Sequence, residues 1–328
     1  MTVDSQGKRP PGRTVIFGFG SQGKAQSQNL RDSGVEVMVS LRRDSPRAVQ
    51  VRESSLDLIE DPAEAAAKAD TAVLLIPDSE QPAFYREVLE RRLPRNAALV
   101  FAHGFAVHYR RIVPRPDLDV ILAAPLAHGE AVRREFCELG AVPCVLAVAQ
   151  DASGRAKDRA RGYARAAFGR GQVIESTFAE EVETDLFAEQ AVLCGGMPEL
   201  ARAAFDTLCD AGYNESIAYA SCMRELRAIV ELMCRDAIAG MLGKVSATAA
   251  YGAATRGPRI INESVRRKLG VILAEIRSGS FAKELCSEAE SGFARLRQEL
   301  AERAGHRIEE VHRGFCIGAP GPGKKGSR

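Results

Sequence analysis

The chain has 328 residues, of which 45% are hydrophobic and 27% charged, and its formal net charge is +2. A chain of this length normally forms two domains, and a charge near zero gives no electrostatic basis for a nucleic-acid partner. No apolar segment reaches the roughly 20 residues that span a membrane, so no membrane partner is expected. Eight cysteines without a CxxC pair, and a start without an apolar leader, predict a cytoplasmic protein.

The first half of the chain alternates short apolar runs with helical stretches. This βαβ rhythm predicts the α/β class, with a Rossmann-like, doubly wound parallel sheet over residues 14–150 that follows a mobile tail, residues 1–13. The expected strands are Thr14–Gly18, Val35–Leu41, Thr71–Ile76, Ala97–Ala102, Val120–Ala124 and Val142–Val148.

A G-x-G-x-x-G motif follows the first expected strand and precedes a helix. In this context the glycines let the backbone approach a pyrophosphate at the helix N-terminus, whereas a tight turn without a ligand is the plainer alternative. The predicted dinucleotide-binding residues are Gly18, Phe19, Gly20, Ser21, Gln22 and Gly23.

The end of the second strand distinguishes between the two nicotinamide dinucleotides. A site for NADH usually has an acidic residue here, but this chain has Arg42, Ser45 and Arg47. Guanidinium groups and a hydroxyl suit a 2′-phosphate, which favours NADPH. Asp44 and the alternative of an exposed basic loop leave NADH open.

Two further loops follow expected strands at the edge where open α/β sheets bind ligands. The first contains His103, a residue able to relay protons or orient metal-bound water, although a lone histidine in a loop is often structural. The second loop, residues 123–130, has no lysine or arginine before Arg133.

After Asp151 the strand pattern stops and helical periodicity takes over. We expect an all-helical domain over residues 151–315, followed by a flexible tail, residues 316–328. The expected helices are Arg155–Phe168, Glu181–Gly195, Pro198–Ala211, Ser216–Ala239 and Val265–Ser278.

Asp185 and Glu189 lie four residues apart in one of these helices, next to an apolar run. Residues at this spacing share a helix face, and two neighbouring carboxylates are suited to a hard cation. A solvated acidic face is the plainer interpretation.

These residues resemble the ketol-acid reductoisomerase family in its short form, over nearly the whole chain from Val15 to about Phe281. The resemblance implies NADPH, two Mg²⁺ ions, a knotted helical domain and a homodimer whose active sites combine residues of both subunits. Pro77 and His103 are further expected cofactor-binding residues. The matching pieces are GFGSQGKA from Gly18, NLRDSG from Asn29, LIPD from Leu75, AHGF from Ala102, VRRE from Val132, QDASG from Gln150 and TRGPR from Thr255.

Carried over to this chain, the family's first acidic pair is Asp185 and Glu189, and its site histidine is His103, so these are expected catalytic residues. The second acidic pair, on a helix from the partner subunit, falls on Ser221 and Glu225. One of its carboxylates is thus a hydroxyl, and Glu225 is a further expected catalytic residue. The expected metal ligands are Asp185, Glu189 and Glu225, and a second Mg²⁺ ion is doubtful. The site lysine is replaced by Leu126. The segment from Ser246 to Gly252 lacks the family's asparagine and glutamate, the latter being Ala250. The expected substrate contacts are Leu126, Ser221, Ser246 and Ala250.

The resemblance implies two reaction stages, an alkyl migration and a hydride transfer. Migration needs a cation or proton donor on each of two reacting oxygens, whereas hydride transfer needs only one such group. We therefore expect an NADPH-dependent reductase of a ketone or imine of a small polar metabolite, in specialised metabolism, with migration weakened or lost. The alternatives are a full ketol-acid reductoisomerase acting on 2-acetolactate, with His128 or Ser221 filling the gaps, and a catalytically silent dinucleotide-binding homologue.

Overall fold

The structure is a computed structural model that describes residues 12–316. It divides into two compact units, Met1–Thr184 and Asp185–Arg328. Nearly all of the expected tails, residues 1–13 and 316–328, lie outside the described residues.

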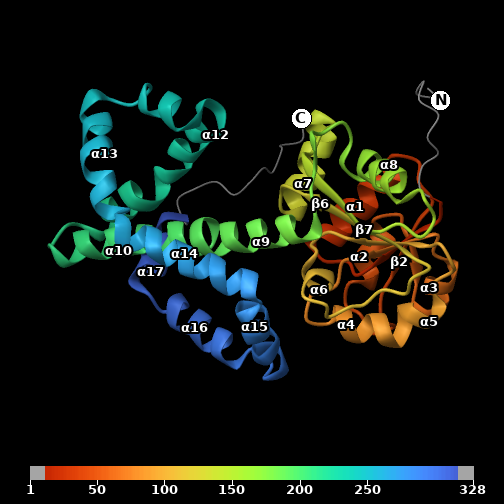
Figure 1. Cartoon of the computed structure of the whole chain (residues 1–328). Helices are drawn as coiled ribbons and strands as arrows, with labels where there is room; N and C mark the ends of the chain where they lie inside the picture. Colours follow the sequence, from red (N-terminus) through yellow and green to blue (C-terminus); the bar gives the residue numbers. More distant parts are fainter. Residues whose placement is uncertain (1–11, 317–328) are drawn as a thin grey trace, which may run out of the picture. The chain divides into compact units, whose positions relative to one another are not determined.

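The first unit contains a single sheet of eight strands, with the order β3-β2-β1-β4-β5-β6-β7-β8. Figure 1 labels β2, β6 and β7 of this sheet and shows the helices around it. Neighbouring strands from β3 through β6 are parallel, β6 and β7 are antiparallel, and β8 runs parallel to β7. The α/β, Rossmann-like class is therefore confirmed, with one antiparallel pair in the sheet. The strands are β1 Thr14–Phe17, β2 Val37–Ser40, β3 Asp57–Ile59, β4 Thr71–Leu74, β5 Ala98–Phe101, β6 Asp119–Pro125, β7 Cys144–Gln150 and β8 Val173–Glu175.

Helices cover both faces of this sheet, as the alternation of side chains along its strands requires. Ile16 and Val100 face a core that includes Leu30 of α1 and Tyr163 of α8, whereas Phe17 faces a second core under α3 and α6. The helical segments are α1 Ser21–Asp32, α2 Ala48–Glu53, α3 Pro62–Lys68, α4 Gln81–Phe84, the π-helix η1 Tyr85–Leu89, α5 Glu90–Arg92, α6 Phe105–His108, α7 Gly129–Leu139 and α8 Ala156–Phe168.

Two strands, β3 and β8, were not predicted from the sequence. Each has three residues and lies at an edge of the sheet. All three residues of β8 are exposed and β3 begins with an exposed aspartate, so neither strand has the continuous apolar run of a buried parallel strand. The prediction that strands end before Asp151 is wrong for β8.

The second unit is helical throughout its described residues, as predicted. It has a small core in which Phe205, Ala218 and Tyr219 pack against Ile308 of the last helix. Helix α9 begins in the first unit and ends in the second. The segments are α9 Phe178–Ala188, the π-helix η2 Glu189–Leu193, α10 Gly196–Asp210, α11 Glu215–Tyr219, the π-helix η3 Ala220–Arg224, α12 Leu226–Leu242, α13 Ala247–Ile260, α14 Glu263–Ser278, α15 Ser280–Glu290, α16 Ala294–Ala304 and α17 Arg307–Cys316.

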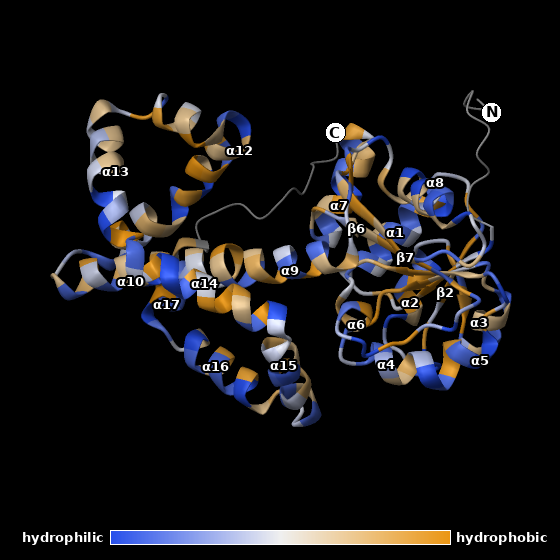
Figure 2. Cartoon of the chain, in the orientation of Figure 1, coloured by the Kyte–Doolittle hydropathy of each residue, from blue (hydrophilic) through white to orange (hydrophobic). Residues whose placement is uncertain are grey.

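Hydropathy differs between the two units (Figure 2). The strands of the first unit are mainly apolar and buried, whereas several large apolar side chains of α12 and α13 are exposed: Val230, Met233, Ile238, Tyr251 and Ile260. Within residues 12–316, no helix combines the length and the apolar character that crossing a membrane would require.

Candidate functional site

The glycine motif forms the tight turn between β1 and α1 that the sequence predicts. Gly18 has φ +104°, and a Cβ there would lie 2.6 Å from the Leu75 carbonyl oxygen. A Cβ on Gly23 would lie 2.3 Å from the Gly18 oxygen. Gly20 is the N-cap of α1 and offers no side chain to the helix N-terminus. Gly18 and Gly23 therefore require glycine, and Gly20 leaves the first amides of α1 without a side-chain cap and available to an anionic ligand.

The basic segment after β2 lies beside this turn. A guanidinium nitrogen of Arg47 lies 3.8 Å from the position that a Cβ on Gly20 would take. Ser45 accepts a hydrogen bond from the Arg47 amide at 3.4 Å, and the Arg42 side chain is exposed. Pro77 follows β4, the strand next to β1, and its carbonyl accepts the amide of Glu80 at 2.9 Å. All four residues follow strands at the carboxyl edge of the sheet.

The loop after β6 is anchored to the glycine turn. The Gln22 side chain donates to the Ala127 carbonyl at 2.9 Å, and a Cβ on Gly129 would lie 2.3 Å from the Ser21 carbonyl. The Leu126 amide donates to Pro143 at 2.9 Å, while the Leu126 side chain is 53% exposed. The backbone of this loop is thus fixed, and Leu126 is left to contact solvent or a ligand.

A buried carboxylate holds the histidine that follows β5. Glu181 of α9 is 7% exposed, and its carboxylate lies 3.3 Å from Nδ1 of His103 and accepts the Gly104 amide at 3.3 Å. A carboxylate only accepts hydrogen bonds, so Nδ1 is the ring nitrogen that donates its proton in a hydrogen bond to Glu181. Gly104 allows this approach, because a Cβ there would lie 2.7 Å from the Phe178 ring.

His103, Glu181 and Asp185 form a cluster that fits one cation. One ligand atom from each lies within 4.8 Å of the others. Asp185 follows Glu181 by one turn of α9, so both carboxylates lie on the same face of the helix. Two carboxylates and an imidazole form a donor set that a divalent cation accepts.

A second histidine and glutamate pair joins α6 to α9. Nε2 of His108 lies 3.5 Å from a carboxylate oxygen of Glu183, and both side chains are largely buried. Burial lowers the pKa of His108, the Glu183 charge partly opposes that shift, and His103 adds to it.

The other predicted residues lie in the second unit. Glu189 begins the π-helix η2, Ser221 lies within the π-helix η3, and Glu225 follows it. Ser246 caps α13 by accepting the Ala249 amide at 3.2 Å, and Ala250 lies in that helix. Across residues 12–316, neither Glu189 nor Glu225 belongs to a cluster of three ligating side chains. Their catalytic and metal-binding roles, and the substrate contacts of Ser221, Ser246 and Ala250, stay predictions.

Comparison with known proteins identifies the family. Residues 12–172 match the family described as acetohydroxy acid isomeroreductase, NADPH-binding domain, and residues 178–315 match the ketol-acid reductoisomerase C-terminal domain. The chain belongs to the ketol-acid reductoisomerase family. It is 34% identical to an NADH-preferring ketol-acid reductoisomerase from an uncultured archaeon, with a TM-score of 0.91 over 94% of this chain and 95% of that chain. Like other members of the ketol-acid reductoisomerase family, it is therefore an NAD(P)-dependent oxidoreductase.

More distant structures share only the fold with this ketol-acid reductoisomerase homologue. A semialdehyde dehydrogenase NAD-binding protein from Cupriavidus necator is 16% identical, with a TM-score of 0.63 over 81% of this chain and 99% of that chain. A pyrroline-5-carboxylate reductase from Coxiella burnetii is 13% identical, with a TM-score of 0.58 over 82% and 98%.

Glu181 is the residue that the sequence analysis missed at this ketol-acid reductoisomerase site. Glu181, Asp185 and Glu189 are spaced by four residues each, so the spacing that identified the last two also applied to the first. The contact with His103 supplied the deciding observation, because it joins residues 78 positions apart.

Proposed function

We propose that this chain is an NADPH-dependent reductase of a ketone or imine in a small polar metabolite, and that its alkyl-migration step is weakened or lost. The observation that carries the proposal is Leu126, which stands at the position of the family's site lysine on a loop anchored to the glycine turn. An anchored leucine cannot donate a proton or place a positive charge on a migrating oxygen.

The altered metal position supports the same conclusion. Ser221 stands where the resemblance places a carboxylate, and a neutral hydroxyl is a weak ligand for Mg²⁺. A migration that develops charge on two oxygens loses stabilisation when one cation and one donor are missing. Removing a single such donor costs roughly 3 to 4 kcal/mol in other enzymes.

Hydride transfer needs fewer groups, and the cluster of His103, Glu181 and Asp185 supplies them. Asp185 and Glu181 would hold one Mg²⁺ ion that polarises the substrate oxygen, and Nε2 of His103 would hold or move a proton. Arg47 beside Gly20 suits the 2′-phosphate of NADPH, although a 34% identical relative prefers NADH.

A full ketol-acid reductoisomerase is the second candidate. It is favoured by the likeness over 94% of the chain to a ketol-acid reductoisomerase and by the His103, Glu181 and Asp185 cluster. In that case His128, exposed two residues after Leu126, would replace the missing donor.

We also propose a homodimer with composite active sites. The exposed apolar side chains of α12 and α13, among them Met233, Ile238 and Tyr251, give a second copy a surface to bury. Size-exclusion chromatography with light scattering tests this, and a monomer at micromolar concentration would contradict it.

The proposed reduction is tested by NADPH oxidation against a panel of small ketones and cyclic imines, with and without Mg²⁺. We expect Mg²⁺-dependent turnover of at least one 2-keto acid or imine. Tight NADPH binding without oxidation by any member of the panel would contradict the proposal and favour a silent dinucleotide-binding protein.

A further inference from the structure

Three hydrogen bonds in series connect the interior of the first unit to the loop that carries Leu126. The Tyr163 hydroxyl donates to Oε1 of Gln26 at 2.6 Å, and Nε2 of Gln26 donates to Oε1 of Gln22 at 3.0 Å. Nε2 of Gln22 then donates to the carbonyl oxygen of Ala127 at 2.9 Å. The series therefore runs from α8 through α1 to the loop after β6.

The direction of the series is fixed by its last member. A backbone carbonyl only accepts, so Gln22 must present its amide nitrogen to Ala127 and its oxygen to Gln26. Gln26 must then present its nitrogen to Gln22 and its oxygen to Tyr163, which leaves Tyr163 as the donor. No amide in the series can turn over without breaking two bonds.

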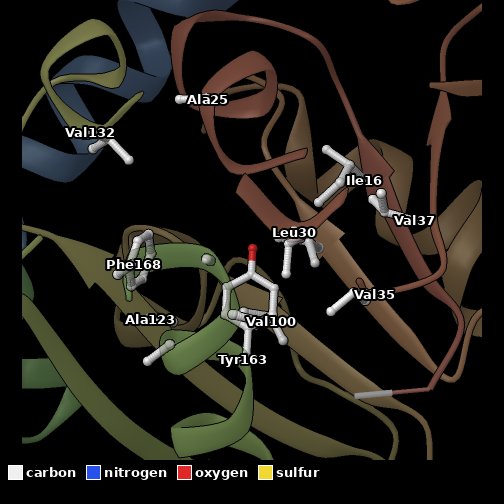
Figure 3. Packing of buried hydrophobic residues seen from close by; sticks show 14 of the residues in the cluster. Ile16, Ala25, Leu30, Val35, Val37, Val100, Ala123, Val132, Tyr163 and Phe168 are labelled. Carbon is white, nitrogen blue, oxygen red and sulfur yellow. The ribbon is translucent and has the colours of Figure 1, made fainter. Parts of the chain in front are cut away.

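The inner members lie where an unmade hydrogen bond is costly. Gln26 is 0% exposed and Tyr163 is 1% exposed, and Figure 3 shows the Tyr163 ring among Leu30, Val100 and Phe168. Burial raises the pKa of Tyr163, so its hydroxyl stays protonated and can donate throughout the neutral range. Water cannot replace a lost partner easily at such a position.

We infer that Tyr163 and Gln26 are positioning residues for dinucleotide binding, because their hydrogen bonds set the spacing between the glycine turn and the loop that carries Leu126. This inference rests on the proposed function, since both loops border the proposed dinucleotide site. Gln22 lies in the glycine motif itself, whereas Gln26 and Tyr163 act only through it.

Breaking the hydrogen-bond series should affect only the part of the Leu126 loop that Gln22 contacts. The Leu126 amide keeps its bond to Pro143, and Gly129 keeps its packing on Ser21, when the series is broken. Without the Tyr163 hydroxyl, Gln26 loses the bond that orients it and holds Gln22 less firmly, so Gln22 would sample other rotamers at the glycine turn. The expected result is weaker cofactor binding in a folded protein.

Tyr163→Phe tests the inference, with Tyr85→Phe as a matched control. Tyr85 is also buried, at 2% exposed, and its hydroxyl accepts the Arg115 amide at 2.8 Å in the other core. We expect the Kd for NADPH, measured by fluorescence titration, to rise about five- to tenfold in Tyr163→Phe and to stay near the wild-type value in Tyr85→Phe. The KM for NADPH should rise with the Kd, while kcat changes less than twofold, within the factor that ~0.4 kcal/mol represents.

A second variant keeps the test independent of folding. Tyr163→Phe with Gln26→Met removes both buried polar partners, a change that is often nearly neutral for stability, yet it still leaves Gln22 without its donor. A raised Kd for NADPH in a variant with wild-type thermal stability supports the inference. If the double variant binds NADPH with wild-type affinity, the inference is overturned but the proposed function is not. If the unmodified protein binds neither NADPH nor NADH, both the inference and the proposed function are overturned.

Discussion

The Glu181 carboxylate contacts both Nδ1 of His103 and the amide of Gly104, each at 3.3 Å. Because the first contact fixes the imidazole and the second fixes the loop that carries it, a single buried side chain orients His103 at the carboxyl end of β5. Asp185 lies one turn further along the same helix, so α9 contributes both carboxylates of the candidate metal cluster next to the histidine.

Glu181→Gln tests this arrangement directly. Glutamine has only one acceptor oxygen, so it can keep the contact with Nδ1 of His103 or with the Gly104 amide but not both, and the cation loses a negative neighbour. We expect kcat/KM and the apparent Mg²⁺ affinity to fall about 10- to 100-fold, the range seen when such supporting groups are removed. Glu180→Gln is the control, because Glu180 is exposed and bonds Ser176 instead. Equal losses in the two variants would contradict the role given to Glu181.

Leu126→Lys should restore part of the migration step. The anchored backbone holds position 126 in place, so a lysine there returns a positive donor to the site. We expect turnover of 2-acetolactate to rise at least about tenfold, a modest part of the 10²- to 10³-fold that one such donor supplies. Leu139→Lys, at an exposed leucine that ends α7, is the control for added charge. If Leu126→Lys does not raise the turnover of 2-acetolactate, the missing lysine is not the cause of the weakened migration.

Arg47→Ala should change cofactor preference. Removing the guanidinium beside Gly20 takes a charge-assisted contact from the 2′-phosphate, which NADH lacks. We expect the Kd for NADPH to rise about tenfold, as a loss of ~1.4 kcal/mol predicts, and the Kd for NADH to change little. Parallel fluorescence titrations with both dinucleotides measure this. An equal loss of affinity for NADPH and NADH would place Arg47 away from the 2′-phosphate. Arg52→Ala is the control, because it removes an exposed arginine that pairs with Glu60.

Stability should fall in mild acid because of His108. Burial lowers its pKa, and the Glu183 charge opposes this only in part. A histidine with a depressed pKa in the folded state contributes stability above its unfolded pKa of about 6.5, and that contribution is lost as the pH falls towards the folded pKa. Urea unfolding from pH 7.5 to pH 5 should therefore show a steeper loss in the wild type than in His108→Gln. If the wild type and His108→Gln lose stability in parallel as the pH falls, His108 is not the cause of the loss.

Ala237→Gly should stabilise the protein. Ala237 has φ 56° and ψ −178° within α12, a conformation that glycine adopts readily and alanine does not. Relief of this strain should raise the free energy of unfolding by about 1 kcal/mol. Ala203→Gly, at an exposed regular position of α10, should instead lower it by about 1 kcal/mol. A destabilised Ala237→Gly variant would contradict the strain at this position.

The sheet domain was largely predictable because its strands carry continuous apolar runs. The six expected strands overlap β1, β2, β4, β5, β6 and β7, and the glycine motif lies where its spacing placed it. The edge strands β3 and β8 were missed because exposed positions do not need apolar residues. The reversed direction of β7 could not be read from the sequence, since an apolar run carries no information about strand direction.

The site was predictable only where local spacing carried the information. Asp185 and the glycine turn follow from short motifs, whereas the pairing of Glu181 with His103 and of Gln22 with Ala127 depends on tertiary contacts between distant segments. The π-helices at Glu189 and Ser221 were also not predicted, because the apolar periodicity continues through them. Such irregular turns often occur at functional positions, so they mark both residues for mutagenesis.

One comparison decides whether reduction survives while migration is weakened or lost. NADPH oxidation with Mg²⁺ is followed with 2-acetolactate and, separately, with its rearranged 2-keto product. We expect kcat/KM for the rearranged product to exceed that for 2-acetolactate by at least about 100-fold, as the loss of ~3 kcal/mol from the migration step predicts. Equal or greater efficiency with 2-acetolactate would contradict the account and identify a full ketol-acid reductoisomerase.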